Sequence, residues 1–405
     1  MKTADPELMR AINRFHVMDA IRRFGPISRV EISDRTELST TTVSAITAAL
    51  LDDHLILPLQ VGAVRDAGRG RPRVMLELAP DAAFVVGVKL APDQITVATT
   101  NFRADVLETL ALPIRVDRQP VSVIADLVED GVRRCVADAG LAIEKISGVC
   151  VGLPGVIARS AGICRQSPIF RERDVPFAAE LEQRLGVAAS VDSDVNLVTL
   201  AEHWFGLGRG LDDFLVVSVE HSLGLGIIHN GEVFRGANGL SPDLGDVLVR
   251  PPAPGVGPGR LALVASAAAI LEQAALAVHG SEHEGAFRNG RGMAKVVELA
   301  EAGHQPIIGV LASAGEALGI AIANLITLFA PPKVILAGAA LAASELLLGS
   351  LRSTVAALTP TSLADVTQIV VHSWGDDSWA RGAAAMILRD LYGAPWNTSG
   401  PVARR

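Results

Sequence analysis

The first 52 residues contain three helical patterns in close succession, and this feature limits the fold most. Apolar side chains recur at helical spacing between residues 7 and 23, so one face of this segment is expected to be buried. The members of that face are Leu8, Ile12, Phe15, Met18 and either Ala20 or Ile21. Ser28 and Glu31 then form an S-x-x-E capping box, which predicts a second helix from there to about Thr36. Ser39 or Thr40 caps a third helix, and the order helix, helix, tight turn, helix predicts a helix-turn-helix.

Two short apolar runs follow the third helix, separated by a flexible tip rich in arginine and glycine. The arginines of this tip are Arg65, Arg69, Arg71 and Arg73. Arginines on a compliant backbone can enter a narrow minor groove or bind phosphates, which is typical of a wing. The alternatives are an ordinary three-helix bundle and a solvated linker. The order and spacing favour a winged helix-turn-helix domain over residues 1–80 that binds double-stranded DNA.

The third helix, which would be the recognition helix, offers hydroxyl groups but no Arg, Lys, Asn or Gln. Hydroxyl groups and threonine methyl groups discriminate between bases less than bidentate contacts do. We therefore expect much of the affinity to come from wing arginines and from arginines near the DNA backbone, namely Arg22, Arg23, Arg29 and Arg35. The candidate DNA-binding residues are Arg29, Ser39, Thr40, Thr41, Thr42, Ser44, Arg69, Arg71 and Arg73.

The length leaves room for two or three domains, since the chain has 405 residues and domains commonly run to about 100–200 residues. Apolar residues make up 49% and charged residues 20%, which predicts a large buried core and excludes global disorder. The net charge is −8, but residues 1–73 carry more Lys and Arg than Asp and Glu. A mildly basic head on an acidic remainder indicates that a polyanionic partner binds the head.

Nothing in the sequence indicates secretion or a membrane span. The first 24 residues carry charges throughout and have no apolar h-region. The most apolar stretch, residues 317–330, is 14 residues long, whereas a span needs about 20, so a buried core helix is expected. The three cysteines, Cys135, Cys150 and Cys164, fit neither a disulfide framework nor a CxxC zinc site. We expect buried free thiols in a cytoplasmic protein.

From about residue 82 the pattern changes to strands and long helices. Three β-like runs come first, followed by an amphipathic helix over residues 121–139 and the strand "ISGVCVGLPG". The strands "DFLVVSVE", "LGIIHNG", "PKVILAGA" and "TQIVVH" follow later, alternating with helices at about 262–278, 305–329, 341–357 and 376–391. Three strands, then helix and strand, repeated in two halves, predict an α/β protein whose residues 81–405 form a two-lobed actin-like (ribonuclease-H-like) ATPase fold.

Several ordered motifs add a family resemblance along nearly the whole chain. The head reads "GPISRVEISDRTELSTTTVSAITAALLDDHLI", followed by "GRGRPRVMLEL". The body continues with "GVCVGLPGVIARSAGICRQSP", "VPFAAELEQRLGVAASVDSDVNLVTLAEHWFG", "LGLGIIHNGEVFRGANG" and "WARGAAAMILRDLYGAPW". In this order the motifs resemble transcriptional regulators of the ROK family, the family of repressors, open reading frames and sugar kinases.

The resemblance places two ATP phosphate loops in this chain, and both depart from the kinase pattern. In the ROK kinases a D-x-G-G-T turn after the first strand holds phosphates, and its backbone approaches them closely. Here Lys89 replaces the aspartate, while Ala91 and Pro92 replace the glycines; Pro92 also lacks an N–H group. The second loop, "EHSLGLG", keeps only Gly224 and Gly226. We therefore expect no phosphotransferase activity and no cofactor.

The resemblance also places the kinase catalytic base, within an N-D-A-N segment, at "SDVN". Asp194 and Asn196 are kept, and Ser193 stands at the first asparagine. A carboxylate there can accept a hydrogen bond from a sugar hydroxyl without phosphoryl transfer. The alternative is that Asp194 merely caps the helix that begins at this point. Ser193 and Asp194 are candidate ligand-binding residues.

The glycine- and proline-rich stretch 239–261, expected as a loop, carries Asp243 and Asp246. From the residues alone this pair could be a carboxylate active site, half of a metal site, or solvated turn chemistry. In many ROK members this segment is G-E-x-G-H followed by a C-x-C-G-x-x-G-C-L-E run that binds zinc and sugar. Here Asp243 stands at the glutamate and Asp246 at the histidine, while Arg260 and Ala262 replace the last cysteine and glutamate. We keep Asp243 and Asp246 as candidate ligand-binding residues and expect no zinc.

A second candidate metal pair, His279 and His283, is spaced i,i+4 in the polar stretch "HGSEHEG". Solvated loop histidines explain this pattern better than a metal site does.

The leading hypothesis is a ROK-type regulator, most simply a repressor, controlled by a sugar or related small molecule. The resemblance implies a homodimer or homotetramer whose heads bind a palindromic operator. The first rival is an ATP-dependent sugar kinase with an accessory DNA-binding head. The second rival is a DNA-binding protein that responds to no ligand.

Overall fold

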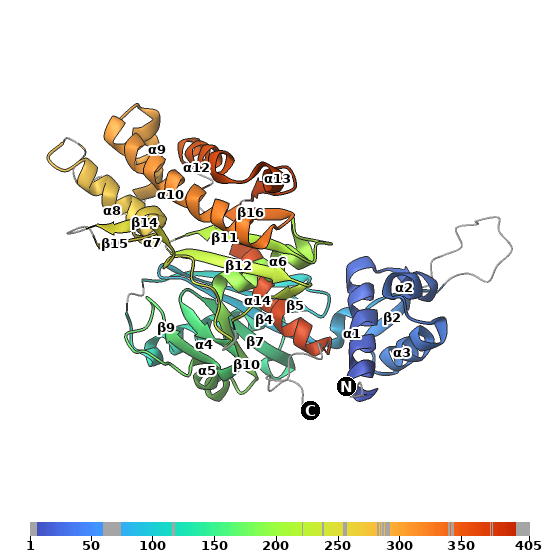
Figure 1. Cartoon of the computed structure of the whole chain (residues 1–405). Helices are drawn as coiled ribbons and strands as arrows, with labels where there is room; N and C mark the ends of the chain where they lie inside the picture. The colour runs from blue at the N-terminus through green and yellow to red at the C-terminus, as the bar shows by residue number, and fades with distance from the viewer. Residues whose placement is uncertain are drawn as a thin grey trace. The chain divides into compact units, whose positions relative to one another are not determined.

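The computed structural model in Figure 1 describes residues 6–59, 74–115, 118–220, 222–236, 239–253, 257–281, 283, 285, 287, 292–338, 341, 344–372, 374 and 376–393. The chain divides into two compact units. Unit 1 consists of Met1–Leu153, Arg159–Asp192 and Trp379–Arg405. Unit 2 consists of Pro154–Ala158 and Ser193–Ser378.

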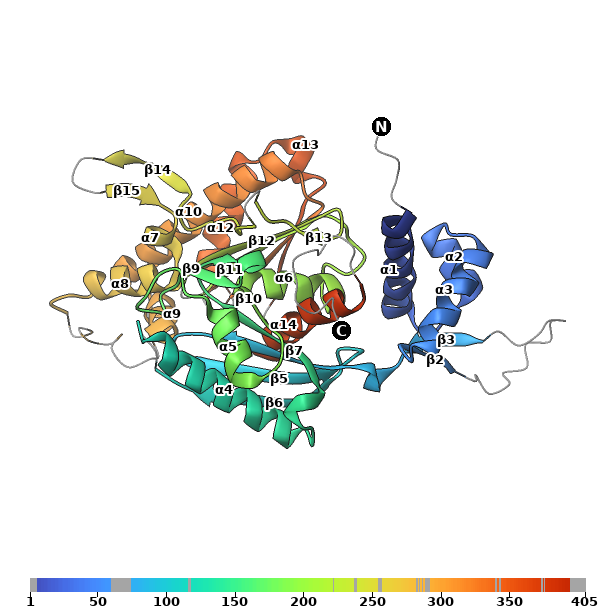
Figure 2. The ribbon, with the colours of Figure 1, turned by 90° about the horizontal axis from the view of Figure 1, so that it is seen from below.

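The head, in unit 1, consists of three helices and a small sheet. Its elements are α1 (Pro6–Phe24), β1 (Ile27–Ser28), α2 (Arg29–Thr36), α3 (Thr40–Asp52), β2 (Ile56–Leu59) and β3 (Met75–Leu78). The sheet has the order β1-β3-β2, and β3 pairs antiparallel with both neighbours. Figure 2 shows α2 and α3 beside α1 and the hairpin of β2 and β3. Three helices followed by a β2–β3 hairpin have the element order predicted for the head.

The ends of the head helices follow from local sequence. The predicted capping box is confirmed, because the Ser28 N–H donates to Glu31 Oε2 at 2.9 Å and the Glu31 N–H donates to Ser28 Oγ at 3.3 Å. Glu37 adopts a left-handed conformation with φ 56°, which ends α2 and turns the chain into α3. The expected buried face of α1 is only partly correct. Its buried residues all lie in the second half of the helix, and Leu8 is 47% exposed.

The main sheet of unit 1 has the strand order β10-β7-β4-β5-β6. Its strands are β4 (Phe84–Leu90), β5 (Gln94–Asn101), β6 (Val106–Pro113), β7 (Ile146–Leu153) and β10 (Ala189–Ser193). The helices that accompany it are α4 (Val121–Asp138), α5 (Phe177–Leu185) and α14 (Asp376–Leu391), and β9 spans Ile163–Gln166. The first two pairings, β4 with β5 and β5 with β6, are antiparallel, whereas β4 pairs parallel with β7.

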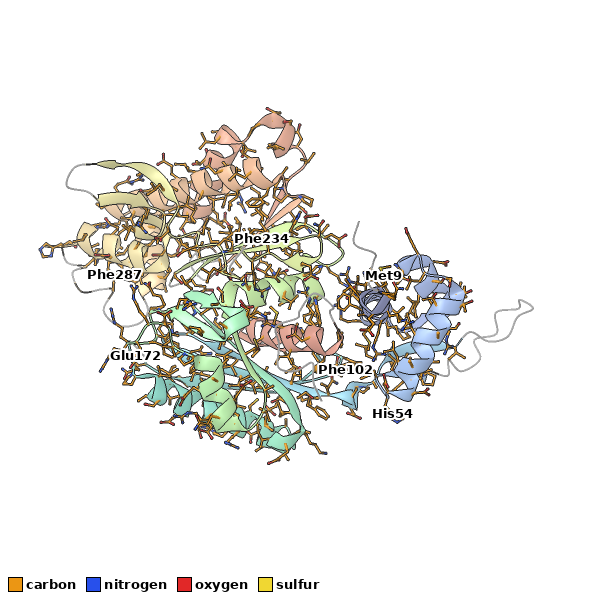
Figure 3. All side chains as sticks on the ribbon, turned by 60° about the horizontal axis from the view of Figure 1, so that its bottom comes forward. Met9, His54, Phe102, Glu172, Phe234 and Phe287 are labelled. Carbon is orange, nitrogen blue, oxygen red and sulfur yellow. The ribbon has the colours of Figure 1, made fainter. Side chains whose placement is uncertain are left out.

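Helix α14 packs closely on this sheet. A Cβ atom at Gly87 would lie 1.9 Å from the Ala380 carbonyl oxygen, so only glycine permits this approach of α14 to β4. Directly after α14, the Tyr392 hydroxyl donates to the Phe102 carbonyl at 2.6 Å, and the two rings meet edge-on with their centres 4.9 Å apart. Phe102 is labelled in Figure 3. The last helix of the chain is therefore an integral part of the core of unit 1.

The main sheet of unit 2 has the strand order β13-β12-β11-β16-β17. Its strands are β11 (Phe214–Val219), β12 (Leu223–His229), β13 (Glu232–Val233), β16 (Lys333–Ala337) and β17 (Gln368–Val371). The other elements are β8 (Val156–Ala158), α6 (Asp194–Phe205), β14 (Leu248–Ala253), β15 (Gly257–Arg260), α7 (Ala262–Ala265), α8 (Ala267–Ala277), α9 (Gly292–Glu301), α10 (Gln305–Phe329), α12 (Glu345–Leu358) and α13 (Thr361–Ala364).

The two sheets repeat one topology. In chain order each sheet runs 3-2-1-4-5, with the first three strands antiparallel and the fourth parallel to the first. This duplication is the one predicted from the strand and helix pattern. Helix α10 is long and apolar enough to cross a membrane, yet more than half of its most apolar window is buried among the core residues of unit 2. It is the core helix that the sequence predicts.

Candidate nucleic-acid interface and ligand site

The start of α3 presents hydroxyl groups to solvent. Ser39, Thr40, Thr41 and Ser44 are exposed, whereas the opposite face of the helix buries Val43, Thr47 and Leu50. Ser39 is the N-cap of the helix, because its Oγ accepts from the Thr42 N–H at 3.1 Å. The Thr42 hydroxyl lies 2.8 Å from Ser39 Oγ. Thr40, Thr41 and Ser44 are thus the least engaged of the predicted contacts on this helix.

The arginines of the head have different surroundings. Arg29 Nε donates to Thr47 Oγ1 at 2.9 Å, which ties α2 to α3, and the Arg35 guanidinium lies 3.7 Å from the centre of the Phe24 ring. Arg22 binds Asp19 and its side chain is only 7% exposed. Burial lowers the pKa of Arg22, although the nearby Asp19 carboxylate raises it. Arg22 is therefore a poor candidate for contacting DNA phosphates.

The wing arginines Arg69, Arg71 and Arg73 lie outside the described residues, as does Arg65. The strands on either side of them are described. Leu59 pairs with Met75 at one end of the two strands, and Ile56 pairs with Leu78 at the other. Residues 60–74 therefore connect the two strands of an antiparallel hairpin. This is the position that the sequence predicts for the wing.

The candidate ligand site lies in unit 2, where α6 begins. Ser193 is 5% exposed and is the N-cap residue of α6, and Asp194 follows as its first residue, half-buried. Asp194 Oδ1 accepts from the Val195 N–H at 2.8 Å. Asp194 thus satisfies one N–H group at the helix start, although Ser193 is the N-cap residue, and its carboxylate stands where the helix dipole favours negative charge.

The buried Asn196 connects this helix start to the stretch that carries the aspartates. Its Nδ2 donates to Ser241 Oγ at 2.6 Å, and Ser241 lies two residues before Asp243. Asp243 is exposed, and its Oδ1 accepts from the Gly245 N–H at 2.9 Å. This hydrogen bond joins the start of α6 to the segment that carries Asp243.

Asp246 has a different partner. Its carboxylate forms an ion pair with Arg260, and the two side chains are 61% and 44% exposed. The Ala262 N–H donates to the Gly245 carbonyl at 2.9 Å, so the residue at the position of the family's last glutamate adjoins the Asp243 turn but brings only a methyl group. Among the described residues, no group of three or more His, Cys, Asp or Glu side chains could hold a metal ion.

The end of this stretch is not the open loop that the sequence predicts. Strands β14 and β15 pair antiparallel. Leu248 pairs with Arg260 and Ala253 pairs with Gly257, and the register shifts between these two pairs. The sequence predicted a loop here because glycine and proline are both uncommon inside strands.

The two glycines kept in the second phosphate loop have a packing role. A Cβ atom at Gly226 would lie 1.8 Å from Thr199 Oγ1, and one at Gly224 would lie 2.8 Å from Val195 Cβ. Both clashes are with α6, so the glycines let β12 and α6 approach each other. In unit 1, the Lys89 ammonium lies 4.5 Å from the centre of the Trp379 ring of α14. Lys89 thus makes a cation–π contact with α14.

The comparisons with known proteins assign these features to one family. The profile of the ROK family matches residues 85–390. The chain belongs to the ROK family. It is 26% identical over 400 residues to a xylose repressor of Caldicellulosiruptor bescii, an alignment that covers 96% of this chain and 98% of the repressor.

Solved structures separate the head from the ROK body. A crystal structure of a ROK family transcriptional regulator, a homologue of the Escherichia coli MLC protein, matches with a TM-score of 0.78 and 25% identity over 95% of this chain and 97% of that chain. A ROK glucokinase from Streptomyces griseus, in complex with glucose and AMPPNP, matches with a TM-score of 0.63 and 22% identity. The kinase is covered to 99% but matches only 75% of this chain. The chain is a ROK transcriptional regulator, and the kinase likeness confirms the actin-like fold of its body.

Two clusters of polar side chains were not predicted from the sequence. In unit 1, Arg159 Nη2 lies 2.9 Å from Asp390 Oδ2, and Arg159 Nη1 lies 3.8 Å from Asp192 Oδ2. The Asp192 side chain is 1% exposed. In unit 2, the carboxylate of Glu202 accepts from His372 Nδ1 at 2.5 Å and from Trp374 Nε1. The partners are separated by 170 residues or more in the pairs Arg159–Asp390, Glu202–His372 and Glu202–Trp374, so no local motif could reveal them. Of the two histidines interpreted as solvated loop residues, His279 is exposed, whereas His283 is half-buried and the centre of its ring lies 5.7 Å from that of His304.

Proposed function

We propose that this regulator is a repressor that binds a palindromic operator through α3 and the wing and is released or retained by a sugar-like effector bound in its body. The observation that carries the proposal is the exposed, hydroxyl-rich start of α3 within a winged helix-turn-helix. The match to regulators over nearly the whole chain, head included, supports it. Residues 1–80 form the DNA-binding domain and residues 81–405 the effector and oligomerisation domain in this proposal, and the site of action is the cytoplasm.

The proposed DNA contacts are the α3 residues Ser39, Thr40, Thr41, Thr42 and Ser44, with Arg29 and the wing residues Arg69, Arg71 and Arg73. The test is the double substitution Arg69→Ala and Arg71→Ala, with DNA affinity measured over a range of salt concentrations. We expect weaker binding and a slope of log K against log salt that is smaller by about 2. Each phosphate contact releases counterions when the protein binds, so a variant with two fewer contacts releases fewer of them.

The control for this test is the pair Arg133→Ala and Arg134→Ala on α4, which removes the same charge from an exposed helix of the body. The control should keep the parental slope. Unchanged affinity and slope in the wing variant would remove the wing from the proposal.

The proposed effector contacts are Ser193, Asp194, Asp243 and, as the outermost member, Asp246. A carboxylate that accepts hydrogen bonds from sugar hydroxyls suits Asp194 and Asp243, which stand on the two segments joined by the Asn196–Ser241 bond. The test is the thermal shift of the purified protein with a panel of sugars, since a ligand of the folded state raises the Tm. A ligand-induced shift that persists fully in both Asp194→Asn and Asp243→Asn would contradict these assignments. No shift with any sugar would favour the ligand-independent rival.

We also propose that the chain is not an enzyme. The support is the use of Lys89 for contact with Trp379 and of Gly224 and Gly226 for packing against α6. Incubation with ATP and the same sugar panel should yield no sugar phosphate. Turnover that disappears in Asp194→Asn would establish the kinase rival instead.

The proposed assembly is a homodimer or homotetramer. A palindromic operator requires two heads related by a two-fold axis, with half-sites spaced by whole turns of the DNA helix. An effector controls binding only if it has different affinities for two arrangements of the heads. Mass measurement in solution, with and without operator DNA, tests the assembly, and a monomer on DNA would contradict it.

A further inference from the structure

The exposed face of α3 is built from small side chains that end in methyl or hydroxyl groups. Thr41, Ser44, Ala45 and Ala48 follow the spacing i, i+3, i+4, i+7 and are all exposed. The buried residues Val43, Thr47 and Leu50 occupy the opposite side. The four exposed positions therefore form one surface, called here the α3 methyl face.

The chemistry of this surface limits what it can read in the major groove. Guanine is read by arginine or lysine, and adenine by asparagine or glutamine. These contacts use long side chains that can make two hydrogen bonds to one base. None of these four residue types occurs in α3. Hydroxyl groups bind donors and acceptors alike and so discriminate weakly. The one base feature that a methyl-bearing surface selects is the C5-methyl group of thymine, which contacts alanine and the threonine methyl.

The two arginines of α2 do not change this picture. Arg29 is tied to Thr47 at 2.9 Å, on the buried side of the helix. Arg35 lies 3.7 Å from the centre of the Phe24 ring, to which it binds by a cation–π contact. Both side chains are therefore held by the head itself, and the α3 methyl face is left to read the bases.

We propose that the α3 methyl face makes thymine C5-methyl groups the principal specificity determinants of the operator half-site, with Thr41 and Ala45 at its centre. The small side chains also let the helix axis approach the base edges closely, because no long side chain separates them. This inference rests on the proposed DNA-binding function and adds which feature of the bases is read.

The test uses the full-length protein and DNA sites selected from a random pool. In the selected half-site each thymine is replaced in turn by deoxyuridine, which lacks only the C5-methyl group. At two or more positions the affinity should fall about fourfold per methyl, the loss expected for one buried methyl group. Deoxyuridine outside the half-sites should change nothing.

A protein variant then assigns the contact. Thr41→Ser keeps the hydroxyl and removes the methyl, so the deoxyuridine effect should disappear at the position that Thr41 contacts. The matched control is Thr36→Ser on α2, where the hydroxyl donates to the Ile32 carbonyl at 2.7 Å and the deoxyuridine effect should remain. Specific binding that is insensitive to every deoxyuridine replacement would overturn the inference and leave the proposed function intact. Failure to select any specific site would overturn both.

Discussion

The two sheets of the body share a topology but differ at the turn between their first and second strands. In unit 1 this turn follows Lys89, whose ammonium lies over Trp379. In unit 2 the corresponding second strand keeps Gly224 and Gly226, whose missing side chains make room for α6. Lys89 thus contacts a ring of α14 in unit 1, whereas Gly224 and Gly226 of β12 allow the close approach of α6 in unit 2. A retained glycine is evidence of close approach, and only the structure shows what approaches.

The halves can also be compared at their fifth strands. Near the end of β10, the buried Asp192 Oδ2 lies 3.8 Å from Arg159 Nη1, and directly after β17, His372 Nδ1 lies 2.5 Å from Glu202 Oε1. In both units a carboxylate pairs with a nitrogen-containing side chain near the end of the fifth strand, a guanidinium in unit 1 and an imidazole in unit 2. They differ in exposure, since Arg159 is 14% and His372 is 36% exposed. The pair in unit 1 is therefore expected to contribute more to the free energy of unfolding.

The largest expected effect is that of Arg159→Ala. Removing the guanidinium leaves the buried Asp192 without this cation, which should lower the free energy of unfolding by about 3 kcal/mol. His372→Ala should cost about 1 kcal/mol, because Glu202 keeps its bonds to Trp374 and to the Leu207 N–H. Chemical denaturation of the purified variants measures both values.

The control for this pair is Arg165→Ala, which breaks an ion pair with Asp174 whose side chains are 48% and 62% exposed. It should change the free energy of unfolding by less than about 0.5 kcal/mol. If His372→Ala proves the more damaging change, the comparison of the two strand ends is wrong.

A smaller effect is expected for Gly226→Ala. The added methyl group would overlap Thr199 Oγ1, and overpacking of this kind costs about 1–3 kcal/mol. The matched control is Gly309→Ala on the exposed face of α10, where nothing lies within 4 Å of the new Cβ. That change should be neutral or stabilise the helix, since alanine is the better helix former. A Gly226→Ala protein with unaltered Tm would refute the packing role.

The smallest effect is expected for Lys89→Met. The loss of the cation–π contact with Trp379 should cost about 0.5–1 kcal/mol. Lys145→Met, at an exposed position of the same unit, provides the matched control and should leave the Tm unchanged. Equal Tm values for the two variants would mean that Lys89 does not stabilise α14 on the sheet.

Local patterns predicted most elements of the fold. The capping box of Ser28 and Glu31, the duplicated strand order and the long apolar helix α10 all follow from contacts between near neighbours or from hydrophobic periodicity. The prediction was wrong for Leu8, because periodicity marks a face but not how far along the helix that face is covered. The β14–β15 hairpin was missed because its glycines and prolines are typical of loops.

The candidate site was less predictable. Asp243 and Asp246 are equivalent in the sequence, yet one caps a turn at Gly245 and the other pairs with Arg260. The bond from Asn196 to Ser241 spans 45 residues, and the ion pair from Arg159 to Asp390 spans 231. Such partners are set by how the chain folds back on itself, which no local pattern records. The wing arginines remain a prediction, since they lie outside the described residues.

The strand β3 occupies the middle of the head sheet, and it is also the last element before the chain continues into Pro80. Through Ser28, which pairs with Met75 and caps α2, this strand is attached to the helix-turn-helix itself. The chain therefore leaves the head from the central strand of its sheet rather than from an edge strand. We expect a rotation of β3 to be passed on to α2, because Ser28, which pairs with Met75 of β3, is also the N-cap residue of α2.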